Sequence, residues 1–546
     1  MPRLLFTNPF AKHDVSEFPD VVIPLAQAQR HNSITSKEKP DDASRGSSDV
    51  HGGSALTVEA LRAEIDTDLA AGGHDTAYDR KSKVINKALT DIGMGKYQWC
   101  LFALCGFGWF ADNLWLQGVA LTLPSLSNEF GVDSNTVRYT TLALFLGLCI
   151  GASFWGVMSD VVGRRLAFNC TLGIAGVFGI AAGAAPNWIG ACALFACVGL
   201  GVGGNLPVDG ALFLEFLPTA NGGLLTLLSV WWPVGQLVSS LVAWPFIVDY
   251  PDNEGWRYFI YTIGALTFFM FACRFCLFHL FESPKFLLSR GRQSEAVAVV
   301  HGIAYHNGVK TWLTEDILNQ IGGDPEVGGD KLATTDIIRR NLNKFSGERI
   351  RPLFANWKLG LTTVLLWFIW TCIGMGYPLF NAFLPQYLGS GDTTPYITYR
   401  NYAITSVVGV PGSILACYTV DIKYVGRKGT MAIATVISGV FLYVFTISSD
   451  PDFQLTFSSL EAFFQNIMYG VLYAYTPEVF PAPNRGTGTG ISSFLNRVAG
   501  LCAPIVAVNA GSANPAAPIY ASGGLFFAAF LGMLALPIET RGKQSL

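Results

Sequence analysis

The chain has 546 residues, of which 51% are hydrophobic and only 14% are charged, and its mean hydropathy is +0.38. A water-soluble protein could not bury that much apolar surface, so the composition excludes an ordinary soluble fold. The net charge of −3 gives no indication of a nucleic-acid-binding surface. All 11 cysteines lie in apolar runs, which indicates packing residues rather than a disulfide framework.

The N-terminal segment is polar. Its first residues contain no apolar core of a cleavable signal peptide, so we expect the first apolar span to direct membrane insertion. Residues 1–55 are rich in Ser, Asp, Gly, Lys and Pro and lack apolar periodicity, which predicts disorder. Leu, Ile and Val recur at helical spacing over 56–72 and 78–92, which predicts two short amphipathic helices. Residues 1–92 are therefore expected to form a largely disordered cytoplasmic tail.

Apolar stretches of about 20 residues follow, each long enough to cross the roughly 30 Å hydrocarbon core of a bilayer as a helix. The first six predicted spans are residues 98–124, 137–158, 166–185, 188–213, 223–248 and 257–280. The other six are residues 357–385, 401–420, 429–447, 455–476, 487–508 and 519–538. The sequence thus predicts an all-α membrane protein with about twelve transmembrane helices in two halves. The expected divisions are the halves 93–280 and 357–538, the central loop 281–356 and the C-terminal tail 539–546.

Basic residues indicate the orientation. Those between the spans gather on one side, at Arg164 and Arg165, in the central loop, at Arg427 and Lys428, and at Arg541. Because cytoplasmic loops carry an excess of Lys and Arg, this side is predicted to be the cytoplasm. Both termini and the central loop are then cytoplasmic, and the plasma membrane is the expected location.

The two halves contain related motifs. Residues 215–223, EFLPTANGG, return as EVFPAPNRG at residues 478–486. The group from Asp160 to Arg165 returns as Asp421 and Gly426-Arg427-Lys428, and Glu282 returns as Glu539. Ordered matches of this kind indicate an internal duplication. Many secondary transporters are built in this way, with the binding site between the repeats near the membrane midplane.

These motifs carry a resemblance to a known family. GVMSDVVGRR resembles the G-x-x-x-D-x-x-G-R-R/K loop of the major facilitator superfamily. FESPKFLLSRGR and YTPEVFPAPNRGTGTG are similar to signatures of its sugar-porter-like branches. GMGKYQWCLFALCGFGWFADNLW and GGNLPVDGALFLEFLP resemble the synaptic-vesicle-protein-related branch and its fungal members. The resemblance, over residues 93–543, implies twelve helices in two pseudo-symmetric halves, with spans one, four, seven and ten lining a central cavity.

The duplicated charges are candidates for a cytoplasmic gate. Asp160 could accept N–H groups of a neighbouring helix N-terminus, while Glu215 and Glu282 could pair with the nearby arginines. The alternative is a set of positive-inside charges without a gating role. The predicted gating residues are Gly156, Asp160, Gly163, Arg164, Arg165, Glu215, Glu282, Asp421, Gly426, Arg427, Lys428, Glu478, Arg485 and Glu539.

Ionisable residues inside the spans are costly in hydrocarbon and are functional candidates by default. Asp112 in span one is our first candidate for proton coupling, and Asp209 in span four is the second; a structural hydrogen bond to a neighbouring helix is the alternative for both. Arg274 is expected to snorkel or to pack structurally. Glu461 is expected to face exterior water.

Substrate binding needs polar groups near the midplane. Arg497 in span eleven could pair with a substrate carboxylate or with one of the acids, because a buried guanidinium requires a counter-anion. Each amide or hydroxyl group in these spans could instead hold helices together. The other binding candidates are Asn113, Gln117, Asn205, Tyr377, Asn381, Gln386, Gln465 and Asn466.

Together these patterns predict a monomeric secondary transporter in a lipid bilayer. The expected activity is proton-coupled symport, by alternating access, of a small polar organic solute such as an organic anion or a sugar-like nutrient. No metal-ligand cluster, nucleotide-binding loop or nucleophile triad is evident, so we expect neither an enzyme nor a cofactor. The alternatives are proton-antiport efflux of amphipathic compounds and a transporter-like nutrient sensor.

Overall fold

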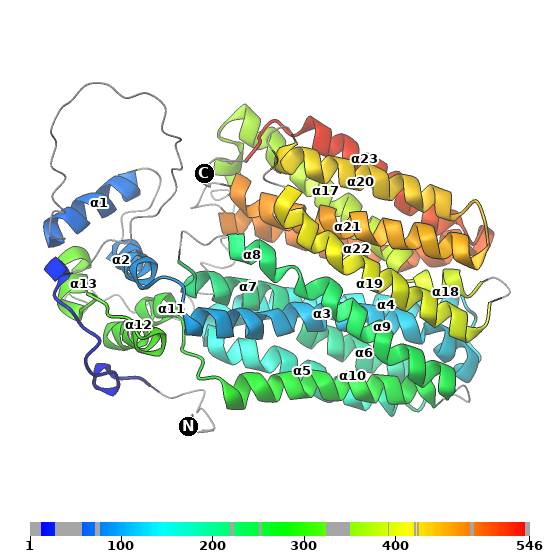
Figure 1. Cartoon of the computed structure of the whole chain (residues 1–546), viewed down its shortest axis with the longest axis horizontal. Coiled ribbons are helices and arrows are strands. Elements are labelled where there is room, and N and C mark those ends of the chain that lie inside the picture. The colour runs from blue at the N-terminus through cyan, green and yellow to red at the C-terminus, as the bar shows by residue number, and fades with distance from the viewer. Residues whose placement is uncertain are drawn as a thin grey trace, which may run out of the picture.

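The computed structural model describes residues 12–27, 57–70, 77–218, 223–250, 254–323, 350–390, 393–419, 422, 425–480 and 485–540. Long helices run side by side along the longest axis, and a smaller group of helices lies beyond one end of them (Figure 1). We call this end of the bundle the tail end, and the opposite end the far end.

Six membrane-spanning segments form the first half. Two of them are interrupted, after Val202 and after Leu228, where short breaks divide the helix. In chain order the segments are α3 (Lys96–Phe130), α4 (Tyr139–Val162), α5 (Arg164–Gly183), α6 with α7 (Trp188–Val202, Asn205–Phe216), α8 with α9 (Gly223–Leu228, Trp231–Asp249) and α10 (Gly255–Ala272), which a π-helical turn, Cys273–Leu277, extends.

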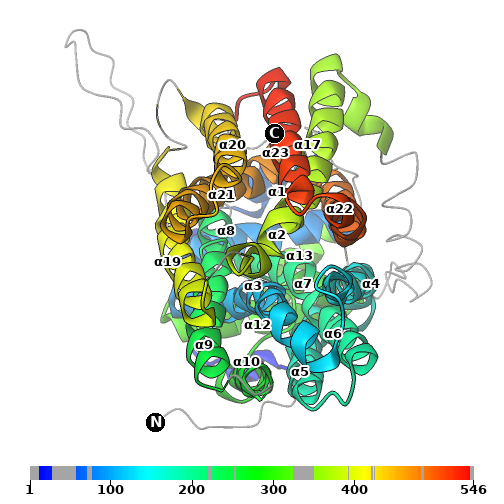
Figure 2. The ribbon, with the colours of Figure 1, turned by 90° about the vertical axis from the view of Figure 1, so that its right-hand side faces the viewer.

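Six segments also form the second half. They are α17 with α18 (Trp357–Asn381, Leu384–Leu388), α19 (Pro395–Thr419), α20 (Gly426–Phe445), α21 (Pro451–Val479), α22 (Arg485–Ala513) and α23 (Ala517–Ala535). Viewed along the bundle, α17 and α19–α23 lie on one side and α3–α7, α9 and α10 on the other (Figure 2). Each segment overlaps one predicted span, so the predicted twelve-helix fold in two halves is confirmed.

Hydropathy alone recognises ten of these segments. Within the described residues, ten helical segments are long and apolar enough to cross a membrane. The exceptions are α19 and α21, with 25 and 29 residues, which are long enough to span. Their apolar pattern is interrupted by polar residues, such as Thr405 and Gln465, which face neighbouring helices instead of lipid.

Local sequence explains where several helices begin and end. Asn187 and Asp450 precede α6 and α21, and their side chains accept hydrogen bonds from the third residue that follows, as N-cap residues do. Gly131 ends α3 with φ of 63°, a left-handed conformation that favours glycine. These caps place the helix ends where the connections turn back.

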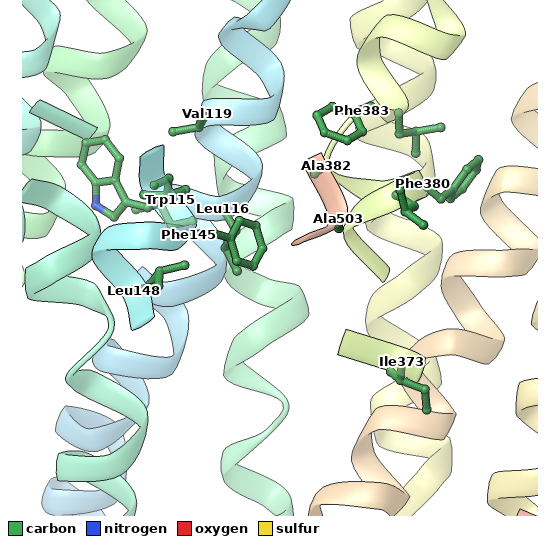
Figure 3. Packing of buried hydrophobic residues seen from close by; sticks show 14 of the residues in the cluster. Trp115, Leu116, Val119, Phe145, Leu148, Ile373, Phe380, Ala382, Phe383 and Ala503 are labelled. Carbon is green, nitrogen blue, oxygen red and sulfur yellow. The ribbon is translucent and has the colours of Figure 1, made fainter. Parts of the chain in front are cut away.

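The hydrophobic core continues across the boundary between the halves. Leu116 and Phe145 of the first half face Ala503 and Phe383 of the second half (Figure 3). A β-carbon on Gly500 of α22 would lie 2.7 Å from the Phe145 ring, so glycine is needed for the observed packing of α4 on α22. The boundary is therefore tightly packed around these residues.

The helices at the tail end form a separate layer. The predicted amphipathic helices are present as α1 (Val58–Ala70) and α2 (Ala77–Ile92). They pack with three helices of the central loop, α11 (Pro284–Ser289), α12 (Gln293–Asn307) and α13 (Glu315–Gly322).

Part of the N-terminal segment joins this layer. Residues 12–27 contain two 3-10 turns, and Val22 forms a parallel bridge with Thr311. The ring of Phe18 lies against Phe281 and Tyr305. The expectation of a disordered tail was therefore wrong for residues 12–27, because their apolar side chains find partners in the central loop; residues 1–11 and 28–56 lie outside the described residues.

Candidate functional site

A partly open cavity lies between the halves, and the space there not occupied by protein atoms is about 350 Å³, including the part open to solvent. The first half supplies α9 and Ser229 from the break between α8 and α9, and the second half supplies α17, α19 and α21. Aromatic rings form much of its wall, and amides and hydroxyls supply its polar groups. The lining residues are Ser229, Trp232, Pro233, Gln236, Tyr377, Ser413, Gln465, Asn466, Tyr469, Gly470 and Tyr473.

The aromatic wall is built by successive turns of α21. Tyr469 and Tyr473 are four residues apart and therefore lie on one helix face, with ring centroids 6.1 Å apart. Trp232 stacks on Tyr469 at 6.0 Å, and Trp370 meets Tyr473 edge-on at 5.0 Å. These contacts hold the rings in fixed positions, and rings of this kind suit an apolar or planar part of a ligand.

An amide network connects the predicted residues of α3 to the cavity. Gln117 donates to the Tyr377 hydroxyl at 2.7 Å and accepts a hydrogen bond from Tyr402. Asn113 donates to the carbonyl oxygen of Trp232 at 2.9 Å. Gln117 thus joins the two halves, while Asn113 fixes the start of α9.

On the second half, predicted residues form a further polar chain. Tyr377, Gln465 and Asn466 line the cavity. Asn381 lies behind them and donates to Gln465 Oε1 at 3.2 Å. The structure therefore brings together most of the polar residues predicted in spans one, seven and ten.

Asp112 and Arg497 form a loose pair between the halves. Asp112 is fully buried on α3, and its Oδ1 lies 3.8 Å from the Arg497 guanidinium on α22. Neither Asp112 carboxylate oxygen has a hydrogen-bond partner in the described part of the chain. The pair lies beside the cavity, because the Trp109 ring, one helical turn before Asp112, contacts Tyr473.

Asp209 has a different setting from Asp112. Its Oδ2 accepts a hydrogen bond from Arg274 at 2.6 Å, and both side chains are fully buried. Arg274 also donates to the carbonyl oxygens of Leu104 and Phe168. Arg274 therefore packs structurally within the first half, which is one of the two possibilities predicted for it. It does not snorkel.

Asn205 belongs to this structural region rather than to the cavity wall. Its amide lies 3.4 Å from the carbonyl oxygen of Gly108. A β-carbon on Gly108 would lie only 1.7 Å from Asp209 Oδ2, so glycine at this position allows the acid to approach α3. Asn205, Asp209 and Arg274 join α7, α3 and the end of α10.

Glu461 departs from the sequence expectation. It was expected to face exterior water, but its side chain is only 1% exposed. The reason is that α21 begins at Pro451 and packs along α19 and α20, so Glu461 lies well inside the bundle. Its Oε1 accepts a hydrogen bond from Gln465 at 2.7 Å.

Gln386 does not line the cavity. It lies at the far end in α18, where it accepts a hydrogen bond from Arg138 Nε at 2.9 Å and donates to the carbonyl oxygen of Ser134 at 2.8 Å. Arg138 also donates to the carbonyl oxygen of Ala507 on α22. These bonds connect the halves at the far end and close this end of the bundle.

At the tail end, the ion pairs expected for Arg164 and Arg427 are present in both halves. Arg164 Nε lies 3.3 Å from Glu215 Oε1, and Arg427 pairs with Glu478 in the same way. Each of these pairs lies within its own half. The duplicated sequence motifs therefore build the same contact twice.

The other two predicted acids bind helix N-termini. Glu282 accepts the backbone N–H of Arg164 at 2.9 Å, and Glu539 accepts that of Arg427 at 3.1 Å. Both arginines lie in the first turn of a helix, so the carboxylates lie where the helix dipole favours negative charge. Burial nevertheless raises the pKa of Glu282 above its ordinary value, although the backbone hydrogen bonds act in the opposite sense.

Further predicted gating residues complete these turns. Gly163 and Gly426, which precede the two arginines, have φ values of 121° and 61°. The backbone N–H of Arg165 lies 3.3 Å from Glu282, and that of Lys428 lies 3.1 Å from Glu539. Gly156 lies on α4 with open space around its α-carbon. Asp421 lies outside the described residues, as do the side chains of Asp160 and Arg485.

Sequence reasoning missed part of the site. Trp232, Gln236 and Tyr473 line the cavity without having been singled out. The spacing of Tyr469 and Tyr473 on one helix was an available signal, since aromatic residues one turn apart share a face. No comparable signal marked Arg138, because it lies at the very start of the predicted span 137–158, where a basic residue close to the membrane surface is unremarkable.

Comparison with known proteins agrees with this architecture. The family model of the Major Facilitator Superfamily matches residues 98–422 and 401–545. The chain is 44% identical to MFS siderochrome iron transporter 1 of Ceriporiopsis subvermispora, over 89% of this chain and 97% of the relative. It is 37% identical to the major facilitator-type transporter hxnZ of Emericella nidulans, over 96% and 97%, and 26% identical to the synaptic vesicle 2-related protein of Xenopus laevis, over 95% and 92%.

Solved structures give the same fold. The partially occluded inward-open xylose transporter XylE from E. coli matches with a TM-score of 0.61 at 18% identity, covering 82% of this chain and 99% of that one. The family and the fold are those of multi-pass membrane transporters rather than enzymes. On the strength of the family match and of relatives that share more than a third of its residues over nearly its whole length, the chain belongs to the major facilitator superfamily.

Proposed function

We propose that the protein is a proton-coupled symporter of a small organic carboxylate, operating by alternating access between the two halves. The observation that carries this proposal is the buried pair of Asp112 and Arg497 beside the cavity. Arg497 retains its charge under all physiological conditions and therefore needs an anion. A substrate carboxylate and the Asp112 carboxylate can each provide one.

The coupling follows from competition between these two anions. When Asp112 takes up a proton, Arg497 loses its counter-anion and becomes available to a carboxylate in the cavity. When the substrate leaves, Asp112 can release the proton and pair with Arg497 again. Because the two residues belong to different halves, the exchange also changes what holds the halves together.

We infer that the tail end is cytoplasmic, since Arg164, Arg165, Arg427 and Lys428 lie there. The far end is then exterior, and Arg138 and Gln386 close the exterior entrance. The duplicated ion pairs at the tail end flank the interior entrance without bridging the halves. Their contacts within each half keep the cytoplasmic helix ends rigid while the halves move.

A second candidate function is proton-antiport efflux of an amphipathic compound. The aromatic wall of Trp232, Tyr377, Tyr469 and Tyr473 favours it, because such rings also bind large apolar groups. A symporter accumulates its substrate when the exterior is more acidic than the interior, whereas an antiporter needs the opposite gradient.

Proteoliposomes test both functions. We would measure uptake of radiolabelled gluconate, malate and 4-hydroxybenzoate, with glucose as a neutral comparison, under pH gradients of either sense. The symport proposal predicts that at least one carboxylate accumulates with an acidic exterior and that a protonophore abolishes the accumulation. Accumulation only with an acidic interior would establish antiport. Flux independent of any gradient would refute proton coupling, and binding without flux would indicate a sensor.

A further inference from the structure

Glu461 is a buried acid that has no counter-ion among the described residues. Gln465 donates to Glu461 Oε1 at 2.7 Å, while no described residue forms a hydrogen bond with Glu461 Oε2. In the part of the chain that the structure describes, no arginine or lysine pairs with this carboxyl. Asp112 and Asp209 differ, since each faces an arginine. An isolated buried charge costs several kcal/mol, so Glu461 is stable in this state only when it is protonated.

Glu461 is connected to the cavity through a single residue. Gln465 lines the cavity, and its amide nitrogen donates to Glu461. Its amide oxygen accepts from Asn381 at 3.2 Å, which fixes the orientation of the amide group. A ligand that bonds to Gln465 therefore changes the hydrogen bonding of Glu461.

Polar side chains also lead from Glu461 towards the far end. The Thr405 hydroxyl on α19 lies 3.1 Å from the Ser458 hydroxyl and 3.3 Å from the Ser459 hydroxyl. Both serines belong to α21. Ser458 precedes Glu461 by three residues and lies on the same helix face. Nearer the far end, Asn401 lies one turn before Thr405, and its amide is 3.4 Å from the carbonyl oxygen of Pro451.

This row of groups suits proton transfer. Hydroxyls both donate and accept hydrogen bonds, so they can pass a proton along a chain. Thr405 and Ser458 are fully buried at the interface of α19 and α21, away from lipid. Charged and titratable groups near the route are few. Arg400 forms a hydrogen bond with Asn401, at the end of the row that lies nearest the far end of the bundle. Tyr377 of α17 and Tyr469 of α21 lie close enough to Glu461 to interact with it electrostatically.

Arginine from the other packed helices does not neutralise this acid. Arg497 of α22 pairs with Asp112 instead. Along α20 and α19 no charged side chain among the described residues interacts with the Glu461 carboxyl. No charge among the described residues therefore neutralises the Glu461 carboxylate, and the side chain is neutral only when it carries a proton.

We propose that Glu461 is a second proton-carrying residue of the transport cycle, loaded from the far end past Asn401 through the hydroxyls of Thr405 and Ser458, and linked to the cavity by Gln465. This inference rests on the proposed proton-coupled function. Together with Asp112 it gives each half one proton-carrying carboxyl, so two protons move with each substrate.

Infrared difference spectroscopy tests the residue without any substrate. Purified full-length protein in nanodiscs is moved between acidic and alkaline buffer, with protons as the only probe. We expect carbonyl bands of buried protonated carboxyls to change with pH in the wild type. The component that belongs to Glu461 should be lost in Glu461→Gln and should shift in Glu461→Asp, while the component that belongs to Asp112 remains. Asp452→Asn is the control, since Asp452 is an exposed acid on the same helix. A band unaltered in Glu461→Gln would overturn the proposal.

Accumulation measures the number of protons. With the membrane potential clamped to zero and a gradient of about one pH unit, each coupled proton contributes about tenfold to the accumulation ratio. Glu461→Gln should therefore lower the ratio about tenfold for whichever of gluconate, malate or 4-hydroxybenzoate the wild type accumulates. An unchanged ratio would refute the role of Glu461 while leaving symport intact. If the wild type accumulates none of them under either gradient, the proposed function fails, and the infrared test still decides whether Glu461 binds a proton.

The route has its own test. Thr405→Val keeps the side-chain shape and removes the hydroxyl that reaches both serines. We expect the infrared band to appear several-fold more slowly after a drop in pH, with the same final amplitude. Proton loading at the wild-type rate would show that protons reach Glu461 another way.

Discussion

Asp112 of α3 and Arg497 of α22 face each other across the boundary between the two halves, 3.8 Å apart and without a hydrogen bond. Both are buried, so neither charge is screened by water as it would be at a surface. Movement of one half against the other changes this separation. The pair is therefore placed to sense the conformation and to respond to a competing carboxylate.

Asp112→Asn should remove the pH dependence of substrate binding. In the wild type, a bound carboxylate competes with the Asp112 carboxylate for Arg497, so its affinity falls as the pH rises. The asparagine cannot compete and imitates the protonated acid. Equilibrium binding of the transported carboxylate, measured from acidic to alkaline pH, should be nearly constant in the variant.

Arg497→Gln supplies the complementary test. It should weaken carboxylate binding at every pH, because the anion loses its cationic partner. Asp452→Asn is a control that should retain the wild-type pH profile. Wild-type pH dependence in Asp112→Asn would contradict the assigned competition.

Neutralising only one member of the Asp209–Arg274 pair should destabilise the fold. Arg274→Met leaves a buried carboxylate without its partner, which typically costs about 3–5 kcal/mol. Thermal unfolding in detergent should show a large loss of stability for the single variant Arg274→Met. The loss should be smaller for the double variant that combines Asp209→Asn with Arg274→Met. Equal losses in both variants would show that packing, rather than the uncompensated charge, dominates.

Arg138→Ala should favour opening of the far end. The substitution removes the hydrogen bonds from Arg138 to Gln386 and to the carbonyl oxygen of Ala507. Spin labels attached through non-natural amino acids at the exposed residues Ser134 and Ser390 report the opening. The distance distribution should move to longer values than in the wild type. An unchanged distribution would mean that other contacts keep this end closed.

Gly163→Ala should destabilise the protein more than Gly156→Ala, although both glycines belong to the same motif. Gly163 has φ of 121°, and a β-carbon there would lie 2.5 Å from Glu282 Oε2. A β-carbon on Gly156 meets nothing within 4 Å. We expect a loss of about 1–3 kcal/mol for Gly163→Ala from backbone strain. Equal losses of stability in the thermal unfolding of the two variants would refute this assignment.

Docking of residues 12–27 should weaken at acidic pH. The Nε2 atoms of His13 and His279 lie 3.1 Å apart. Burial lowers the pKa of His279 from 6.5 to about 4, and repulsion from His13, Arg165 and His306 acts in the same direction. Glu17 opposes the shift.

The sign of this effect follows from linkage. A histidine whose pKa is lower when docked stabilises docking fully above about pH 6.5, and this contribution is lost as the pH falls towards about 4. Hydrogen exchange of residues 12–27 should therefore accelerate as the pH is lowered through this range, after correction for intrinsic rates. His279→Gln should reduce the pH dependence of this exchange. Exchange of residues 12–27 that does not change with pH in the wild type would contradict the prediction.

Sequence alone determined the spans, the two halves and the duplicated turns. Hydropathy marks most of the spans because a chain in hydrocarbon must satisfy its backbone hydrogen bonds within each helix. Motif spacing suffices for the turns because Gly163, Arg164 and Glu215 recur in order in the second half. The same reasoning placed Asn113, Gln117, Tyr377 and Gln465 near one site.

Only the tertiary structure decided which of these polar groups meet. It paired Asp209 with Arg274, moved Gln386 to the far-end contact with Arg138, and buried Glu461 against α19. The physical reason is that local periodicity fixes the face of a helix but not the rotation and depth at which two distant helices pack. The partner of a buried charge, and hence its role, depends on that packing.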